Sequence, residues 1–85
     1  MLNSKQQKTL EEIFETPTRS NILWTDVESL FLSLGATVQQ GKGSRVRVAL
    51  NGVKAVFHEP HPQKEVSKCT VKDIKEFLIN ANVTP

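Results

Sequence analysis

The 85-residue chain has few of the residues that are typical of disulfide-bonded, zinc-binding or membrane-spanning proteins. Its single cysteine, Cys69, cannot form an internal disulfide, which agrees with a reducing compartment. Two histidines and one cysteine are too few, and wrongly spaced, for a structural zinc site. No apolar run approaches the length of a membrane span, and the N-terminus lacks the apolar segment of a signal peptide. We therefore expect a cytoplasmic protein with no metal, no cofactor and no membrane contact.

The chain also lacks linkers, repeats and low-complexity tracts, so it is expected to form one domain over residues 1–85. It has no phosphate-binding glycine loop, because Gly41-Lys42-Gly43-Ser44 is too short and does not lead from a strand into a helix. No motif pairs Cys69 with a histidine, and we interpret it as a free, inert thiol. At 38% apolar and 24% charged residues, the composition is that of an ordinary globular domain.

What the chain does have is a strong β-hairpin pattern over residues 45–58. Asn51-Gly52 favours a type I′ turn, because both central residues of that turn need φ > 0. A two-residue turn fixes the register, so Arg45 should face His58. One face of the hairpin is then wholly apolar and is expected in the core, with Val46, Val48, Leu50, Val53, Ala55 and Phe57.

The other face of the hairpin is predicted to be basic, with Arg45, Arg47, Lys54 and His58. The net charge of +2 is modest, but the segment from Lys42 to Arg47 contains three basic residues and no acidic one. The position of the basic residues is therefore more informative about function than the net charge. It makes this face the main functional clue in the sequence.

Helical patterns flank the hairpin on both sides. We predict a helix over residues 4–15, ended by Thr16-Pro17, and a second that begins with a Thr25–Glu28 capping box and ends at Gly35. Residues 36–40 form a plausible first strand. Thr70 is expected to cap a last helix with an apolar face that contains Val71, Ile74, Phe77, Leu78 and Ala81. Trp24 is interpreted as a packing residue, the alternative being a platform for base stacking.

The predicted order is thus α-α-β-β-β-α, an α+β fold with a three-stranded antiparallel sheet. Three amphipathic helices should cover the apolar face of the sheet and leave its basic face for solvent or a partner. Residues 59–68 contain two prolines and are expected to run extended along the surface.

Basic side chains and imidazoles beside a glycine turn are enough for RNA cleavage without a metal. A base takes the 2′-OH proton, cations stabilise the phosphorane and an acid protonates the leaving oxygen. His58 opposite Arg45 is one candidate, and His61 between two prolines is another. The residues alone favour an ordinary strand-end histidine beside solvated arginines, with the catalytic interpretation as the alternative.

Three stretches together resemble the HicA toxin family. They are Gly43-Ser44-Arg45 with the hairpin, then Phe57-His58-Glu59-Pro60-His61-Pro62, and finally Lys64-Glu65 with the run from Lys68 to Ile74. HicA proteins are the RNA-cleaving toxins (mRNA interferases) of bacterial HicA–HicB toxin–antitoxin pairs. The resemblance covers about residues 25–83 and leaves residues 1–17 as an N-terminal helical extension. It implies the α-β-β-β-α fold of double-stranded-RNA-binding domains, here with one extra helix.

The resemblance also implies a function and a site. The function would be metal-independent cleavage of mRNA by a cytoplasmic bacterial endonuclease, held in check by a HicB-type antitoxin. RNA would be bound by Lys42, Gly43, Ser44, Arg45, Arg47 and Lys54. The family carries its catalytic histidine where this chain has Arg45, so His58 or His61 would have to supply the imidazole. A non-catalytic RNA-binding module and a protein-interaction module on the same fold remain open alternatives.

Overall fold

The computed structural model describes residues 2–85 and has the predicted order of elements. Its helices are α1 (Ser4–Ile13), α2 (Trp24–Ser33) and α3 (Lys68–Asn80), and its strands are β1 (Thr37–Gln40), β2 (Arg45–Leu50) and β3 (Val53–His58). The strands form one antiparallel sheet in the order β1-β2-β3. The α+β prediction is therefore confirmed.

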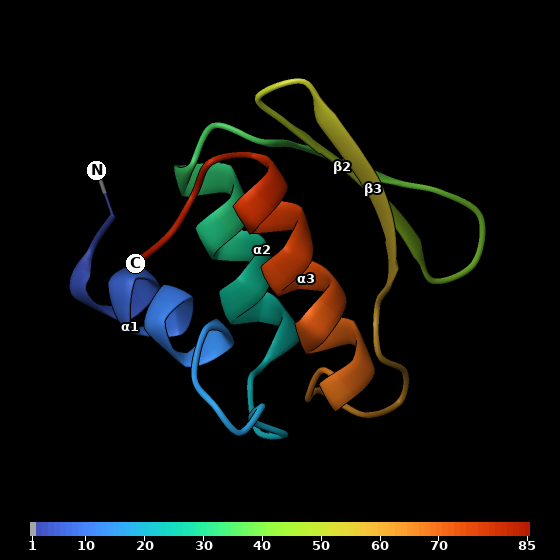
Figure 1. Ribbon diagram of the computed structural model, residues 1–85. Coiled ribbons are helices and arrows are strands. Elements are labelled where there is room, and N and C mark those ends of the chain that lie inside the picture. The colour runs from blue at the N-terminus through green and yellow to red at the C-terminus, as the bar shows by residue number, and fades with distance from the viewer. Residues whose placement is uncertain (1) are drawn as a thin grey trace.

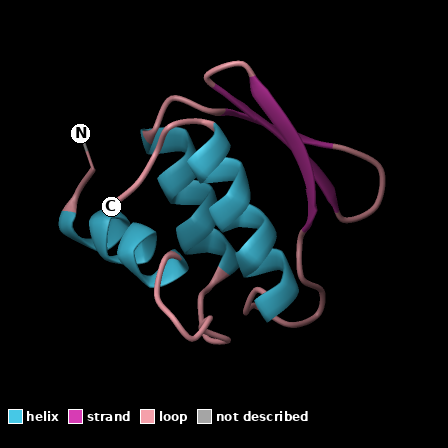
Figure 2. Ribbon diagram, in the orientation of Figure 1, coloured by secondary structure: helices cyan, strands magenta, loops and turns pink. Residues whose placement is uncertain are grey.

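Figures 1 and 2 show three layers: the sheet on one side, α2 and α3 in the middle, and α1 on the far side. α2 contacts β1 and α3 contacts β3, whereas α1 packs on α2 and α3. The prediction that all three helices cover the sheet was wrong in this respect. The middle layer is apolar on two sides, and α1 covers the side that faces away from the sheet.

The hairpin has the predicted register throughout, from Leu50 opposite Val53 to Arg45 opposite His58. Asn51 and Gly52 have φ values of 52° and 82°, as a type I′ turn requires. Most of the predicted core face is buried, while Val53 and Ala55 are only partly buried against it. The two-residue turn thus decides which side chains reach the outer face of the sheet.

Three phenylalanines pack together between the sheet and the middle layer. Phe31 of α2, Phe57 of β3 and Phe77 of α3 pack with ring centroids 5.7–5.9 Å apart, two of the pairs edge to face. Phe57 is next to His58 in the chain, so this cluster also fixes the end of β3. Trp24 is buried, with 3% of its surface exposed, which confirms its packing role and leaves no ring face for a base.

Both predicted helix N-caps were wrong. Leu23, not Thr25, is the N-cap of α2, and it makes no side-chain capping bond. Ser67, not Thr70, caps α3, and its hydroxyl accepts a hydrogen bond from the backbone N–H of Thr70. In each case the helix begins before the residue that the pattern favoured. Backbone pairing between the segments that precede the two helices sets where each helix can start. Leu23 forms a bridge with Glu65, and the Val66 N–H donates to the Ile22 carbonyl.

Candidate functional site

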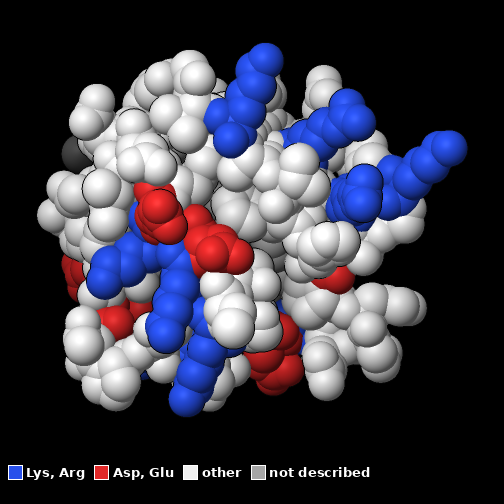
Figure 3. All heavy atoms as spheres, turned by 45° about the vertical axis from the view of Figure 1, so that its right-hand side comes forward, with Lys and Arg blue, Asp and Glu red and all other residues white. Residues whose placement is uncertain are grey.

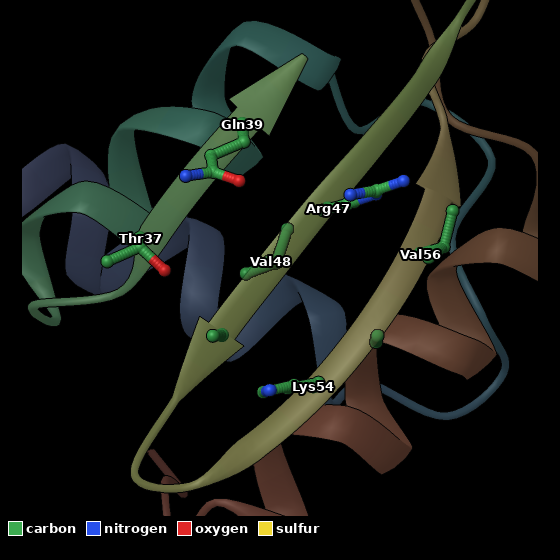
Figure 4. Close-up of a pocket in the computed structure, with 8 residues that line it drawn as sticks. Thr37, Gln39, Arg47, Val48, Lys54 and Val56 are labelled. Atoms are coloured by element: carbon green, nitrogen blue, oxygen red, sulfur yellow. The ribbon is translucent and has the colours of Figure 1, made fainter. Parts of the chain in front are cut away.

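The outer face of the sheet, the side away from the helices, is built from short rows of side chains across the strands. Thr37 of β1, Ala49 of β2 and Lys54 of β3 form one row, and Gln39, Arg47 and Val56 form the next. These residues line a shallow hollow of about 610 Å³ (Figure 4). In the same view the Arg47 side chain extends over the sheet toward β3.

Arg45 and His58 form the last row, where β2 begins and β3 ends. Both side chains are exposed. The register makes them a pair without mutual backbone hydrogen bonds, the arrangement in which facing side chains lie closest in an antiparallel sheet. The predicted neighbourhood of imidazole and guanidinium is therefore present. Both groups are open to solvent and could face the same phosphate.

His61 lies in a different place, beside the turn that joins β1 to β2. Gly43, Ser44, Glu59 and His61 line a hollow of about 520 Å³. The Glu59 N–H donates to the Ser44 carbonyl over 2.7 Å, which ties the segment after β3 to this turn. Because Ser44 precedes Arg45 in the chain, this hollow lies next to the Arg45–His58 pair.

The turn itself is compact and presents its residues outward. The Gly41 N–H donates to the Arg45 carbonyl over 2.8 Å, and Gly43 has a φ of 65°, a conformation that favours glycine. Lys42, Gly43 and Ser44 are all exposed. The structure thus brings these three residues, His61 and the Arg45–His58 pair to one end of the sheet, with Arg47 and Lys54 along its outer face.

Glu59 is the residue at this site that sequence reasoning missed. It shares the hollow with His61 and accepts a hydrogen bond from the Gln40 side chain over 3.4 Å. The hairpin register places Glu59 opposite Ser44, one position beyond the Arg45–His58 pair, and the pairing of β1 with β2 brings Gln40 to the same end of the sheet. The predicted hairpin register, extended by one residue past His58, was the signal that could have found it.

Charge is unevenly distributed over the surface. In Figure 3 a group of Lys and Arg side chains occupies the upper right, where Figure 1 places the sheet, with little acid among them. Elsewhere in that view basic and acidic side chains are mixed. Within residues 2–85, the ion pairs join Lys5 to Asp26 and Arg19 to Glu12 and Glu15, all away from the sheet. The cations on the outer face are therefore uncompensated by the protein.

Two further observations concern the described part of the chain. Residues 2–85 contain no group of three or more His, Cys, Asp or Glu side chains placed to hold a metal ion. None of the helices in that range combines the length and apolar character needed to cross a bilayer.

Comparison with known protein families gives a match. The model of the family described as HicA toxin of bacterial toxin-antitoxin matches residues 24–83, which include both hollows and the Arg45–His58 pair. No curated protein and no solved structure matches the chain. The match spans well over half of the chain and follows α2, the sheet and α3 in order, so the chain belongs to the HicA toxin family of bacterial toxin–antitoxin systems.

Proposed function

We propose that this toxin binds RNA on the outer face of its sheet and cleaves it by metal-independent transfer to the ribose 2′-OH. The observation that carries the proposal is the row formed by Arg45 and His58, with the His61 hollow beside it. An imidazole is the usual proton carrier near neutral pH, and a guanidinium can hold two phosphate oxygens at once.

The chemistry divides among the groups at this end of the sheet. One imidazole takes the 2′-OH proton as that oxygen attacks the phosphorus, and a protonated group returns a proton to the leaving 5′-oxygen. Arg45 stabilises the charge that develops on the phosphorane oxygens. It cannot act as the base, because a guanidinium keeps its proton in proteins. His58 is assigned the base role and His61 the acid role.

Arg47, Lys54 and Lys42 hold the RNA backbone on either side of the reacting phosphate. All three are exposed, and none forms an ion pair with a residue in the described range. The antitoxin partner implied by the family is proposed to silence the toxin by covering this face. Because a small sheet face offers few base-reading groups, phosphate contacts should dominate the binding.

The test is cleavage of a single-stranded RNA by purified toxin in the presence of EDTA. His58→Ala and His61→Ala should each lower the rate by roughly 10²-fold or more, since general acid–base catalysis typically contributes that much. Both variants should keep the circular dichroism spectrum of the parent. A His58→Ala protein with an unchanged rate and fold would contradict the assignment of His58.

A second candidate function, RNA binding without cleavage, is supported by the resemblance described above, which implies that Arg45 stands where the family carries its catalytic histidine. Tight RNA binding with no cleavage by the parent protein would establish it. Induced expression separates the two in cells. The toxin proposal predicts growth arrest that is relieved by the product of the neighbouring gene, and the binding module predicts no arrest.

A further inference from the structure

The β3 strand is a free edge of the sheet. β2 pairs with β1 on one side and β3 on the other, so β3 has a single neighbouring strand within residues 2–85. A two-residue turn makes Leu50 and Val53 a hydrogen-bonded pair, and hydrogen-bonded pairs alternate along the ladder. The backbone N–H and C=O groups of Lys54, Val56 and His58 therefore point away from β2, toward the open side.

A groove runs along this edge between β3 and α3. It has a volume of about 240 Å³, and it is lined on the strand side by residues 53–57 and on the helix side by Asp73, Glu76, Phe77 and Asn80. Asp73 and Glu76 are exposed and form no ion pair with any residue from 2 to 85. The lining thus combines apolar side chains with two carboxylates on the helix side of the groove.

Exposed edges are normally short or protected, because they pair readily with other strands. β3 is six residues long, whereas the opposite edge strand, β1, has four. Val56, at the middle of β3, has 54% of its surface exposed, one of the few large apolar side chains left open. A strand of this length, with unpaired backbone groups and an open valine, is suited to strand addition.

The charges on the two sides of this edge are opposite. The outer face carries Arg47 and Lys54, and the side toward α3 carries Asp73 and Glu76. Side chains of an added strand alternate between these two sides. Acidic residues would therefore suit one set of positions, and basic or small apolar residues the other.

We propose that the antitoxin inserts an extended segment along β3 as a fourth strand, with acidic side chains over the outer face and basic ones toward α3. This inference rests on the proposed function for the identity of the partner. It goes further by naming the edge, the backbone groups and the charge alternation that the partner must have. An added strand would also lie beside His58, so docking and silencing would occur at the same place.

A second copy of this chain fits the same edge poorly. Antiparallel pairing of two β3 strands would join two outer faces that each carry Arg47 and Lys54. On the other face it would bring two sets of Asp73 and Glu76 together. Gathering like charges on each face of the joined sheet opposes self-association.

Amide hydrogen exchange tests the inference in the protein as it exists. The toxin is released from its coexpressed complex, refolded and examined by NMR, alone and after addition of the product of the neighbouring gene. Alone, the amides of Val53, Ala55 and Phe57 should be protected and those of Lys54 and Val56 should exchange fast. The partner should slow exchange at Lys54 and Val56 by roughly tenfold or more.

Each outcome decides something. Binding that protects other surfaces but leaves Lys54 and Val56 unchanged overturns strand addition and leaves the proposed function intact. Protection that grows with toxin concentration alone assigns the edge to a second copy and overturns the antitoxin as occupant. No binding by the neighbouring product overturns both the inference and the antitoxin part of the proposed function.

Two variants sharpen the result. The Val56 N–H points away from β2, so Val56→Pro removes this outward N–H and no hydrogen bond to β2. Proline is tolerated at edge positions of this kind. It should weaken antitoxin binding by more than about tenfold, while the helical amides stay protected.

Glu76→Gln should weaken antitoxin binding and leave RNA cleavage unchanged. Its matched control is Glu11→Gln, another exposed helical glutamate without an ion pair, which should change neither. Equal effects of the two Gln variants would contradict the charge pattern.

Discussion

At the scale of single residues, Asn51 does more than shape the hairpin turn. Its φ of 52° suits the type I′ turn, and its side-chain amide also donates to the Ala81 carbonyl over 2.8 Å. Ala81 is the C-cap of α3, where carbonyl groups lack helical partners. One side chain thus links the tip of the sheet to the end of the last helix. The sequence signal for the turn was clear, but nothing in it indicated this second contact.

Substitution of Asn51 separates the two roles. Asn51→Gly keeps the backbone conformation and loses the hydrogen bond to Ala81, so it should lower the free energy of unfolding by about 1 kcal/mol. Asn51→Ala loses the hydrogen bond and also strains the turn, which should add about 1 kcal/mol more. Urea denaturation measures both. Equal stability of the glycine variant and the parent would show that the hydrogen bond contributes nothing.

The cap of α3 gives a second prediction at this scale. The Ser67 hydroxyl accepts the Thr70 N–H over 3.3 Å and donates to the Thr70 hydroxyl over 3.0 Å. Ser67→Ala should destabilise the protein by about 1 kcal/mol, the usual cost of losing an N-cap. Thr70→Ala removes only the hydroxyl pair and should cost less. If Thr70→Ala proved the more harmful in thermal unfolding, the sequence-based assignment of the cap would be restored.

At the scale of elements, hydrophobic periodicity and turn chemistry predicted every helix and strand. They failed where two residues of similar type competed, as Ser67 and Thr70 did for the cap of α3. They also failed for α1. Its apolar stripe predicted that the helix packs against the rest of the protein, but it did not indicate which elements it contacts. Its partners are α2 and α3, far along the chain, and a contact of that kind leaves no local pattern.

α1 lies outside the family match, yet its residues belong to the same core as the matched region. Leu10 and Ile13 are buried with 3% and 1% of their surfaces exposed. The Gln6 side chain donates to the Ser29 hydroxyl of α2, and the Lys75 ammonium of α3 lies 5.7 Å from the Phe14 ring centroid. We therefore propose that α1 and the residues that flank it are an integral layer of one domain that also contains the matched region.

Truncation of a buried α1 side chain tests this layer. Ile13→Ala should lower the free energy of unfolding by about 2–5 kcal/mol, a large share of what a small domain has. Glu11→Ala, two positions away and exposed, should change it by less than about 0.5 kcal/mol. Chemical denaturation of both variants gives the comparison. A small effect of Ile13→Ala would mean that α1 is only an appendage of the matched region.

At the scale of the whole molecule, the fold separates its charges by layer. The ion pairs of the described residues lie around α1, α2 and the segment between them, whereas the outer face of the sheet keeps its cations unpaired. The hairpin register predicted which residues share that face. The position of His61 could not be predicted in the same way, because β3 ends at His58 and no strand register fixes where the segment after it lies.

This separation predicts that charge position, not net charge, controls RNA affinity. Arg47→Glu and Lys8→Glu change the net charge equally, but Arg47 lies on the outer face of the sheet and Lys8 is an exposed residue of α1. Arg47→Glu should weaken RNA binding and lower the slope of log K against log salt by about 0.7, the value for one lost contact to a single strand. Lys8→Glu should leave the slope unchanged. Titrations of a fluorescent RNA at several salt concentrations measure both slopes. Equal slopes for the two variants would show that RNA binds elsewhere than on the sheet. An RNA affinity that neither variant alters would favour an outer face that binds only protein.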